Sequence, residues 1–325
     1  MLLSVAAVIV GIVALVWSAD RFVLGASGTA ENLGVSPLII GLVIAGFATS
    51  SPEMLVASIA AWGGNPGLGV GNAVGSNIAN IGLILGASAI AVPLVSRSRI
   101  LGREIPLLLI VTAVTIGLLL DRWLGRLEGL VLLAALVGGL AWMLRQALRQ
   151  RHTDDDALAA ELVEHVPREI PLARSLTWLL VGFVVLLLSS RSLVWGGVNI
   201  AEAVGVSDLV IGLTIVAVGT SLPELAAAVA SGLKGEPDLV LGNVIGSNFF
   251  NTLAVLGLPA IIRPGLVPAD VLTRDLPVMA AMTLLLLPLL AHRRNQLGRI
   301  SRPEGALLLT CFLGYQGYLL TTLSP

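Results

Sequence analysis

Apolar runs separated by short polar segments fill almost the whole chain. Ten of these runs are long enough to cross about 30 Å of hydrocarbon as helices of roughly 20 residues. The predicted spans are Leu2–Leu24, Pro37–Ala61, Pro66–Val92, Ile105–Leu120, Leu127–Leu148, Leu176–Val198, Leu209–Ser231, Leu239–Ile262, Leu276–Leu290 and Ala306–Leu320. The pattern predicts an all-α integral membrane protein with ten transmembrane helices.

The chain also contains an internal repeat. The segment from Ala30 to Gly86 aligns without a gap with the segment from Ala201 to Gly257, at a constant offset of 171 residues and with 26 identities in 57 positions. Each repeat holds five predicted spans, an odd number, so the second is expected to lie upside down relative to the first. We therefore predict a first repeat at residues 1–149, a linker at 150–174 and an inverted second repeat at 175–325. The repeated motifs lie at about 30–92 and 201–262.

Composition and charge agree with a membrane setting. Hydrophobic residues make up 56% of the chain and charged residues 12%, about half of the roughly 25% that is usual in soluble domains. The net charge of −1 argues against a nucleic-acid partner, and the lone cysteine, Cys311, excludes an intramolecular disulfide. No cofactor and no obligate protein partner are expected; the lipid bilayer is the expected surrounding.

The basic residues predict the orientation. With the N-terminus outside, 14 of the 19 lysines and arginines lie at inner loops and helix ends, as the positive-inside rule requires. We expect a multi-pass protein of the cell inner or plasma membrane with both termini outside and the central linker cytoplasmic. The linker is rich in acidic and basic residues; a solvated segment is favoured over a regulatory metal site, because its charges lack metal-ligand spacing.

The candidate chemistry begins in the second and seventh spans, where Glu53 and Glu224 fall near mid-span. Each glutamate follows a proline, Pro52 or Pro223, in the sequences GlyPheAlaThrSerSerProGlu and AlaValGlyThrSerLeuProGlu. Proline has no N–H and crowds the carbonyl four residues earlier, so the helix is expected to loosen there. Backbone oxygens freed at membrane depth, beside a carboxylate, suit a hard cation.

The third and eighth spans supply a second pair of polar faces. Ser76 and Asn80 are four residues apart, as are Ser247 and Asn251, so each pair shares one helical face that can point at the glutamates. Serines and asparagines alone can be interhelical hydrogen-bonding groups, and the neighbouring glycines can serve close helix packing. An intramembrane glutamate is costly, which favours a functional site over a purely structural one.

Two full copies of (Gly/Ala)-x-x-Thr-Ser-x-Pro-Glu followed by Gly-Asn-x-x-Gly-Ser-Asn-x-x-Asn resemble the alpha repeats of the cation/calcium exchanger superfamily. The likeness is to its bacterial and archaeal sodium/calcium exchanger-like branch. It implies that spans two, three, seven and eight form a compact core, while long, tilted spans one and six slide across that core to alternate access.

The resemblance also implies a set of ion ligands. Calcium would bind Glu53 and Glu224 with the backbone oxygens of Thr49 and Thr220. Sodium sites would add Ser50, Ser76, Ser221 and Ser247 with the carbonyls of Gly46 and Ala217, and Asn80 and Asn251 would complete the central group. Well-studied sodium/calcium members often carry aspartate where this chain has Asn251, so the coupling ion stays open between Na⁺ and H⁺.

The expected function is secondary active exchange of Ca²⁺ for Na⁺ or H⁺ by alternating access. A Ca²⁺/H⁺ exchanger without sodium coupling is the first alternative, and a cation channel built from the same oxygens is the second. An intramembrane enzyme is not expected, because no span carries paired aspartates or an Asp-rich metal motif. An anion transporter is disfavoured because two central glutamates repel anions.

Overall fold

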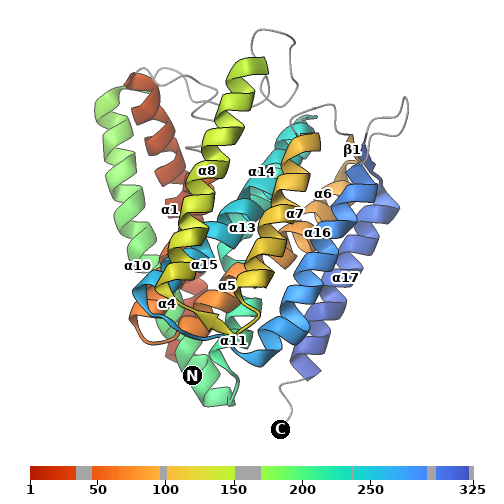
Figure 1. Cartoon of the computed structure of the whole chain (residues 1–325). Coiled ribbons are helices and arrows are strands. Elements are labelled where there is room, and N and C mark those ends of the chain that lie inside the picture. Colours follow the sequence, from red (N-terminus) through yellow and green to blue (C-terminus); the bar gives the residue numbers. More distant parts are fainter. Residues whose placement is uncertain (34–45, 96–100, 151–169, 236, 291–297, 322–325) are drawn as a thin grey trace.

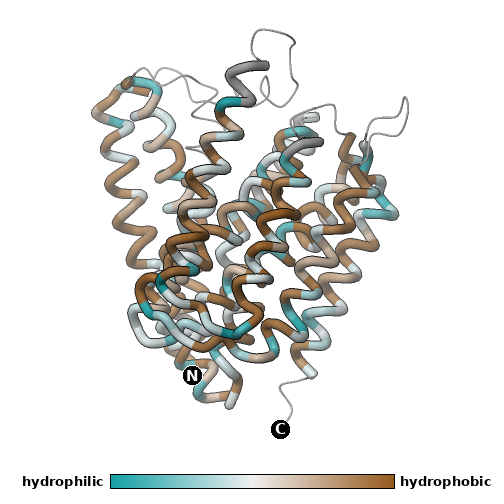
Figure 2. Tube along the Cα trace, viewed as in Figure 1, coloured by the Kyte–Doolittle hydropathy of each residue, from teal (hydrophilic) through white to brown (hydrophobic). Residues whose placement is uncertain are grey.

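The computed structural model describes residues 1–33, 46–95, 101–150, 170–235, 237–290 and 298–321. Helix fills most of this part of the chain, from α1 (Leu2–Asn32) to α17 (Arg302–Thr321). Figure 2 shows hydrophobic residues along much of α7 (Leu101–Leu118) and α10 (Leu172–Val204), as expected for helices that face lipid.

Where the structure describes the predicted spans they are helical, apart from breaks at Ser50 and Ser221 and from the last residues of the third and fourth spans. Within the described residues, six helices are long and apolar enough to cross a membrane, and the bent pair Asp208–Thr220 and Leu222–Leu233 makes a seventh. Helix also occupies the other predicted ranges, in α7, in α17 and in the described part of the second span. The all-α membrane class is confirmed; the full count of ten spans and the repeat boundaries stay predictions. The linker prediction falls mainly outside the described residues.

The two halves have matching elements. The second span comprises α3 (Gly46–Thr49) and α4 (Ser51–Trp62), and the seventh comprises α11 (Asp208–Ile211), η3 (Gly212–Val216), α12 (Ala217–Thr220) and α13 (Leu222–Lys234). The third span comprises α5 (Pro66–Ala79), η2 (Asn80–Leu85) and α6 (Gly86–Ala91), and the eighth comprises α14 (Pro237–Phe250), η4 (Asn251–Val255) and α15 (Leu256–Ile262). The starts of α4, α5 and η2 recur 171 residues later in α13, α14 and η4.

Short antiparallel strands join elements distant in sequence. β1 (Leu94–Val95) pairs with β4 (Arg299–Ile300), and β2 (Trp123–Leu124) pairs with β3 (Gly265–Leu266). β1 and β3 are themselves related by the 171-residue offset. Each pair therefore links one half of the chain to the other.

The third and eighth spans form the centre of the molecule. Their segments Pro66–Ala91 and Pro237–Ile262 are 83% and 78% buried, against 33% for α1 and 22% for α10. α5 packs against α4, η3, α11, α12 and η4, so it contacts both halves. Around this centre lie α8 (Arg126–Gln150), η5 (Val271–Asp275), α16 (Leu276–Leu290), α7 and α17.

The first and sixth spans form a separate pair at one flank, with α16 and α17 at the opposite flank (Figure 1). Both helices are longer than predicted: α1 continues to Asn32 and α10 to Val204. The polar, glycine-rich end of α1 remains helical because it packs against the start of α10, where Gly28 faces Ser175. At Gly25 and Gly182 an added Cβ would collide with the backbone of the other helix, so glycine allows the two backbones to touch.

Candidate functional site

The glutamates stand just past a break in each of two spans. α3 ends at Thr49 and α4 begins at Ser51; α12 ends at Thr220 and α13 begins at Leu222. The residues between them leave helical geometry in the same way, with ψ of 1° at Ser50 and 4° at Ser221. The predicted loosening before Pro52 and Pro223 is confirmed as a fact of local structure.

The third and eighth spans contain the second irregularity. A wider, π-type turn begins at Asn80 in η2 and at Asn251 in η4. Such turns are rare and often occur at functional sites, because they shift the side chains that follow to a different face. These turns are not predictable from the sequence, because the spacing of Ser76 and Asn80 fits a regular α-helix equally well.

Direct hydrogen bonds join the two halves at these irregularities. Ser221 Oγ donates to Glu53 Oε1 at 3.4 Å, and Asn80 Nδ2 donates to Asn248 Oδ1 at 3.0 Å. Asn77 Nδ2 donates to Thr252 Oγ1 at 2.9 Å. The Glu224 carboxylate is close enough to interact with the charge of Glu53. The structure therefore brings the polar residues of spans two, three, seven and eight together.

The predicted site residues are almost all removed from water. Glu53 and Glu224 are each only 1% exposed. The buried members of the set are Ser50, Glu53, Ser76, Asn80, Ala217, Thr220, Ser221, Glu224, Ser247 and Asn251. Thr49 is partly exposed, and Gly46 contributes backbone at the start of α3. A buried charge of this kind persists only if something compensates it.

Many oxygens of this group have no hydrogen-bond partner. In the part of the chain that the structure describes, the unpartnered buried oxygens include one from Glu53, both from Glu224, the hydroxyls of Ser50 and Ser247, and the amide oxygens of Asn77, Asn80 and Asn251. Buried polar atoms are nearly always paired, so a concentration of unpaired ones needs an explanation. Oxygen atoms from carboxylates, amides and hydroxyls are the donor set that hard cations such as Ca²⁺ and Na⁺ prefer.

The composition of the site also argues against a transition-metal centre. Among the described residues no three His, Cys, Asp or Glu side chains are placed together so that they could hold a metal ion. Two carboxylates and a surrounding set of neutral oxygens remain, and such ligands select hard cations over soft ones.

Four amides outside the predicted ligand set also belong to this region. Asn72, Asn77 and Asn248 are buried, and Asn243, the counterpart of Asn72, has a buried Nδ2. Asn77 also donates to the sulfur of Met279 at 3.3 Å. All four stand in the repeated Gly-Asn-x-x-Gly-Ser-Asn motif, so the signal was visible in the sequence, but it did not distinguish ligands from residues that hold ligands in place.

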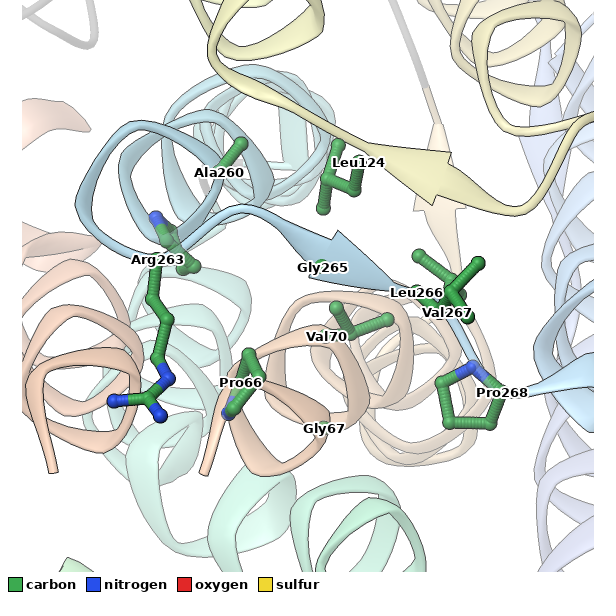
Figure 3. A pocket seen from close by; sticks show the side chains of 11 residues that line it. Pro66, Gly67, Val70, Leu124, Ala260, Arg263, Gly265, Leu266, Val267 and Pro268 are labelled. Carbon is green, nitrogen blue, oxygen red and sulfur yellow. The ribbon is translucent and has the colours of Figure 1, made fainter. Parts of the chain in front are cut away.

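A small surface pocket lies elsewhere, at the start of α5 beside β3. Figure 3 shows the Arg263 side chain reaching past Pro66, at the first turn of α5. None of the twelve predicted site residues lines it. The candidate site is therefore the buried polar group and not this pocket.

Comparison with known proteins agrees with this geometry. The family model described as sodium/calcium exchanger protein matches residues 3–145 and 174–321. CaxA of Alkalimonas amylolytica is 49% identical over 320 residues, which cover 98% of this chain and 99% of the relative. The inner membrane protein YrbG of Escherichia coli strain K12 is 40% identical over 299 residues, 92% of each chain.

A solved structure gives the same result. The sodium-calcium exchanger NCX_Mj, soaked with Na⁺ and Sr²⁺, superposes with a TM-score of 0.66 at 30% identity, covering 100% of this chain and 99% of that one. The chain therefore belongs to the sodium/calcium exchanger family of the cation/calcium exchanger superfamily.

Proposed function

We propose that this protein is a secondary active antiporter that exchanges Ca²⁺ for Na⁺ or protons at one buried site by alternating access. The observation that carries the proposal is the group of unpartnered oxygens around two buried carboxylates. Calcium takes 6–8 oxygen ligands, and the oxygens of Glu53, Glu224 and their neighbours supply a set of that size. The family membership supports cation exchange in general terms.

In this proposal different ligands bind different ions. Glu53 and Glu224 bind Ca²⁺ together with the carbonyls of Thr49 and Thr220. Sodium binds beside the same carboxylates, at the hydroxyls of Ser50, Ser76, Ser221 and Ser247 and the carbonyls of Gly46 and Ala217. Asn80 and Asn251 contribute amide oxygens at the centre.

Charge balance explains why one site can bind either one Ca²⁺ or two monovalent cations. Two ionised glutamates carry two negative charges, which one Ca²⁺ neutralises. Two Na⁺ or two protons, one on each glutamate, neutralise the same charge. Because Asn251 is an amide, it can donate an oxygen to an ion but cannot take up a proton. Exchange of one Ca²⁺ for two monovalent cations would balance the charge of Glu53 and Glu224.

Close packing on one side of the site favours exchange over a passive channel. An added Cβ at Gly71 would collide with the carbonyl of Leu209, and one at Gly212 would collide with that of Leu68. The backbones of α5 and of α11–η3 are thus in direct contact, which leaves no path for an ion between them. A channel needs both sides open at once, whereas an exchanger needs one side closed at any time.

Calcium-45 uptake into proteoliposomes, with sodium, proton or potassium gradients imposed one at a time, tests the proposal. We expect accumulation of calcium against its own gradient when an outward sodium or proton gradient is present. Uptake that merely equilibrates, or that responds to potassium alone, would contradict it. Empty liposomes and Glu53→Gln protein are the controls.

The site also predicts a dependence on pH. Protons and Ca²⁺ compete for the same carboxylates, so acidification lowers the fraction of sites able to bind calcium. The calcium concentration needed for half-maximal uptake is expected to rise as the pH falls on the side of uptake. Calcium uptake measured between pH 8 and pH 5.5 at several calcium concentrations checks this; an unchanged half-maximal concentration would exclude the competition.

We further propose that both termini are outside and the 150–174 linker is cytoplasmic. In Figure 1 the start of α1 and the end of α17 lie at one end of the molecule, while the end of α8 and the start of α10 lie at the other. The relative named as an inner membrane protein supports the location. A fusion of alkaline phosphatase to the C-terminus should be active in cells. An inactive phosphatase fusion, together with a fluorescent C-terminal fusion of green fluorescent protein, would show that the C-terminus is cytoplasmic and contradict this orientation.

A further inference from the structure

One buried asparagine joins three segments of the site. Asn72, fully buried on α5, donates from Nδ2 to the backbone oxygen of Glu53 at 3.1 Å. Its Oδ1 accepts from Thr220 Oγ1 at 3.1 Å and from Ser76 Oγ at 3.5 Å. A single amide thus connects the helix that carries one glutamate to the broken span of the other repeat.

The equivalent residue in the second repeat is bonded differently. Asn243 lies 171 residues after Asn72, and its Nδ2 is buried without a hydrogen-bond partner in the described part of the chain. The counterpart of the bond to Glu53, a bond to the backbone oxygen of Glu224, is therefore not made. Both motifs contain the same Gly-Asn-x-x-Gly-Ser-Asn-x-x-Asn residues, so we attribute this difference to the conformation of the two halves.

Helix packing closes the half of the molecule on the Asn72 side. At Gly75 an added Cβ would lie 2.7 Å from the Cβ of Ala217 and 2.8 Å from the Cα of Leu213, so α5 and η3 touch backbone to backbone. The half bounded by α5, α11 and α12 is closed, and α11 lies toward the end of the molecule where the N-terminus is found (Figure 1).

We propose that Asn72 and Asn243 are alternating latches. Asn72 holds closed the half of the ion pathway that is bounded by α5, α11 and α12, and it positions Glu53 and Thr220. When the opposite half closes, Asn243 makes the equivalent bonds to the Glu224 carbonyl and the Thr49 hydroxyl, and Asn72 releases its partners. A side-chain amide can donate to a carbonyl and accept from a hydroxyl at once. This inference deepens the proposed exchange function and rests on it for its consequence.

Cysteine accessibility tests the latch without measuring transport. In a Cys311→Ser background, Leu209→Cys places a thiol on α11 at a residue that is 4% exposed and whose backbone oxygen faces Gly71. The full chain, purified in detergent, is labelled with a maleimide. Asn72→Ala should speed labelling of this thiol at least tenfold. Asn243→Ala, the matched control, should leave it unchanged or slower, because it weakens the opposite closed state.

A second cysteine, placed outside the closed half, distinguishes opening of that half from general unfolding of the protein. Leu286→Cys lies fully buried on α16, outside the closed half. Acceleration at Leu209→Cys alone supports the latch. No acceleration there, or equal acceleration at both thiols, would overturn it. If the Asn72→Ala protein does not purify, Asn72→Ser, whose hydroxyl is too short to reach Glu53 and Thr220 together, gives the same comparison.

Measurements of calcium transport and of calcium binding then distinguish failure of the latch proposal from failure of the proposed function. Asn72→Ala should lower calcium exchange at least tenfold while calcium still raises the melting temperature, because Asn72 is not a ligand. If calcium no longer raises the melting temperature of Asn72→Ala, Asn72 is itself a ligand and the latch is wrong. If the variants show the expected labelling pattern but the wild-type protein exchanges no calcium, the proposed function fails and the latch stands.

Discussion

At the scale of single residues, the two glutamates differ in how they are satisfied. Glu53 Oε1 accepts a hydrogen bond from Ser221, whereas neither carboxylate oxygen of Glu224 has a partner among the described residues. Carboxylates in such surroundings are destabilising unless a cation joins them. The cost of burying them is therefore an argument that the site exists to bind an ion.

We predict that Glu53→Gln and Glu224→Gln each reduce calcium exchange by at least about 100-fold, because even outer partners of metal ligands contribute about 10–100-fold to affinity. The folded protein should survive, since glutamine removes a buried charge without changing the shape of the side chain. Its melting temperature in calcium-free detergent should equal or exceed that of the wild type. Normal exchange by either variant would remove that glutamate from the site.

Asn251 is the residue on which the choice of coupling ion depends. Asn251→Asp adds a third carboxylate, which favours a further monovalent cation in the pocket. The ratio of sodium-driven to proton-driven calcium uptake should rise at least about fivefold, the low end of ordinary coupling free energies. Asn80→Asp, at the equivalent position of the first repeat, is the matched comparison. An unchanged ratio in Asn251→Asp would show that Asn251 does not set the ion preference.

At the scale of elements, glycines decide where helices touch. Gly75→Ala should force α5 and η3 apart, because its Cβ would meet the backbone of Leu213, and overpacking of this kind costs about 1–3 kcal/mol. Gly246→Ala has no such neighbour within the described chain. Melting in detergent should therefore show a loss of about 2 °C or more for Gly75→Ala and a smaller loss for Gly246→Ala. A smaller loss for Gly75→Ala than for Gly246→Ala would contradict the close contact of α5 with η3.

A buried ionic cluster holds η5 and α16 to α17. Asp275 is fully buried, accepts from Arg274 Nε at 2.6 Å and from Arg274 Nη2 at 3.2 Å, and accepts from the Tyr315 hydroxyl at 2.8 Å. Asp275→Ala leaves a largely buried guanidinium without its main partner, at a cost of about 3–5 kcal/mol. Tyr315→Phe removes one neutral donor, worth about 1 kcal/mol. Melting temperatures should fall in that order; a larger loss for Tyr315→Phe would contradict it.

At the scale of the whole molecule, the sequence predicted what depends on local pattern and internal repetition. The breaks at Ser50 and Ser221 follow from Pro52 and Pro223, and the gathering of four spans follows from the duplicated motif. The strand pair between Leu94 and Ile300 was not predicted, because two-residue strands carry no pattern and their partners are far apart in sequence. The Asn72 bonds escaped prediction for a similar reason: which residues an amide bonds depends on the conformation of the folded protein.

The duplication also raises a question of number, since two copies of a motif can make two sites or one. The hydrogen bond from Ser221 to Glu53 crosses the repeats, and so does the bond from Asn80 to Asn248. Because each half supplies partners to the other, the account requires one shared cation site between Glu53 and Glu224.

Isothermal titration of Ca²⁺ into the purified, sodium-free protein tests that claim most directly. A shared site should bind one Ca²⁺ per chain, with binding lost in Glu53→Gln and lost equally in Glu224→Gln. Two Ca²⁺ per chain, or a variant of either glutamate that retains half of the binding at unchanged affinity, would show two independent sites and contradict it.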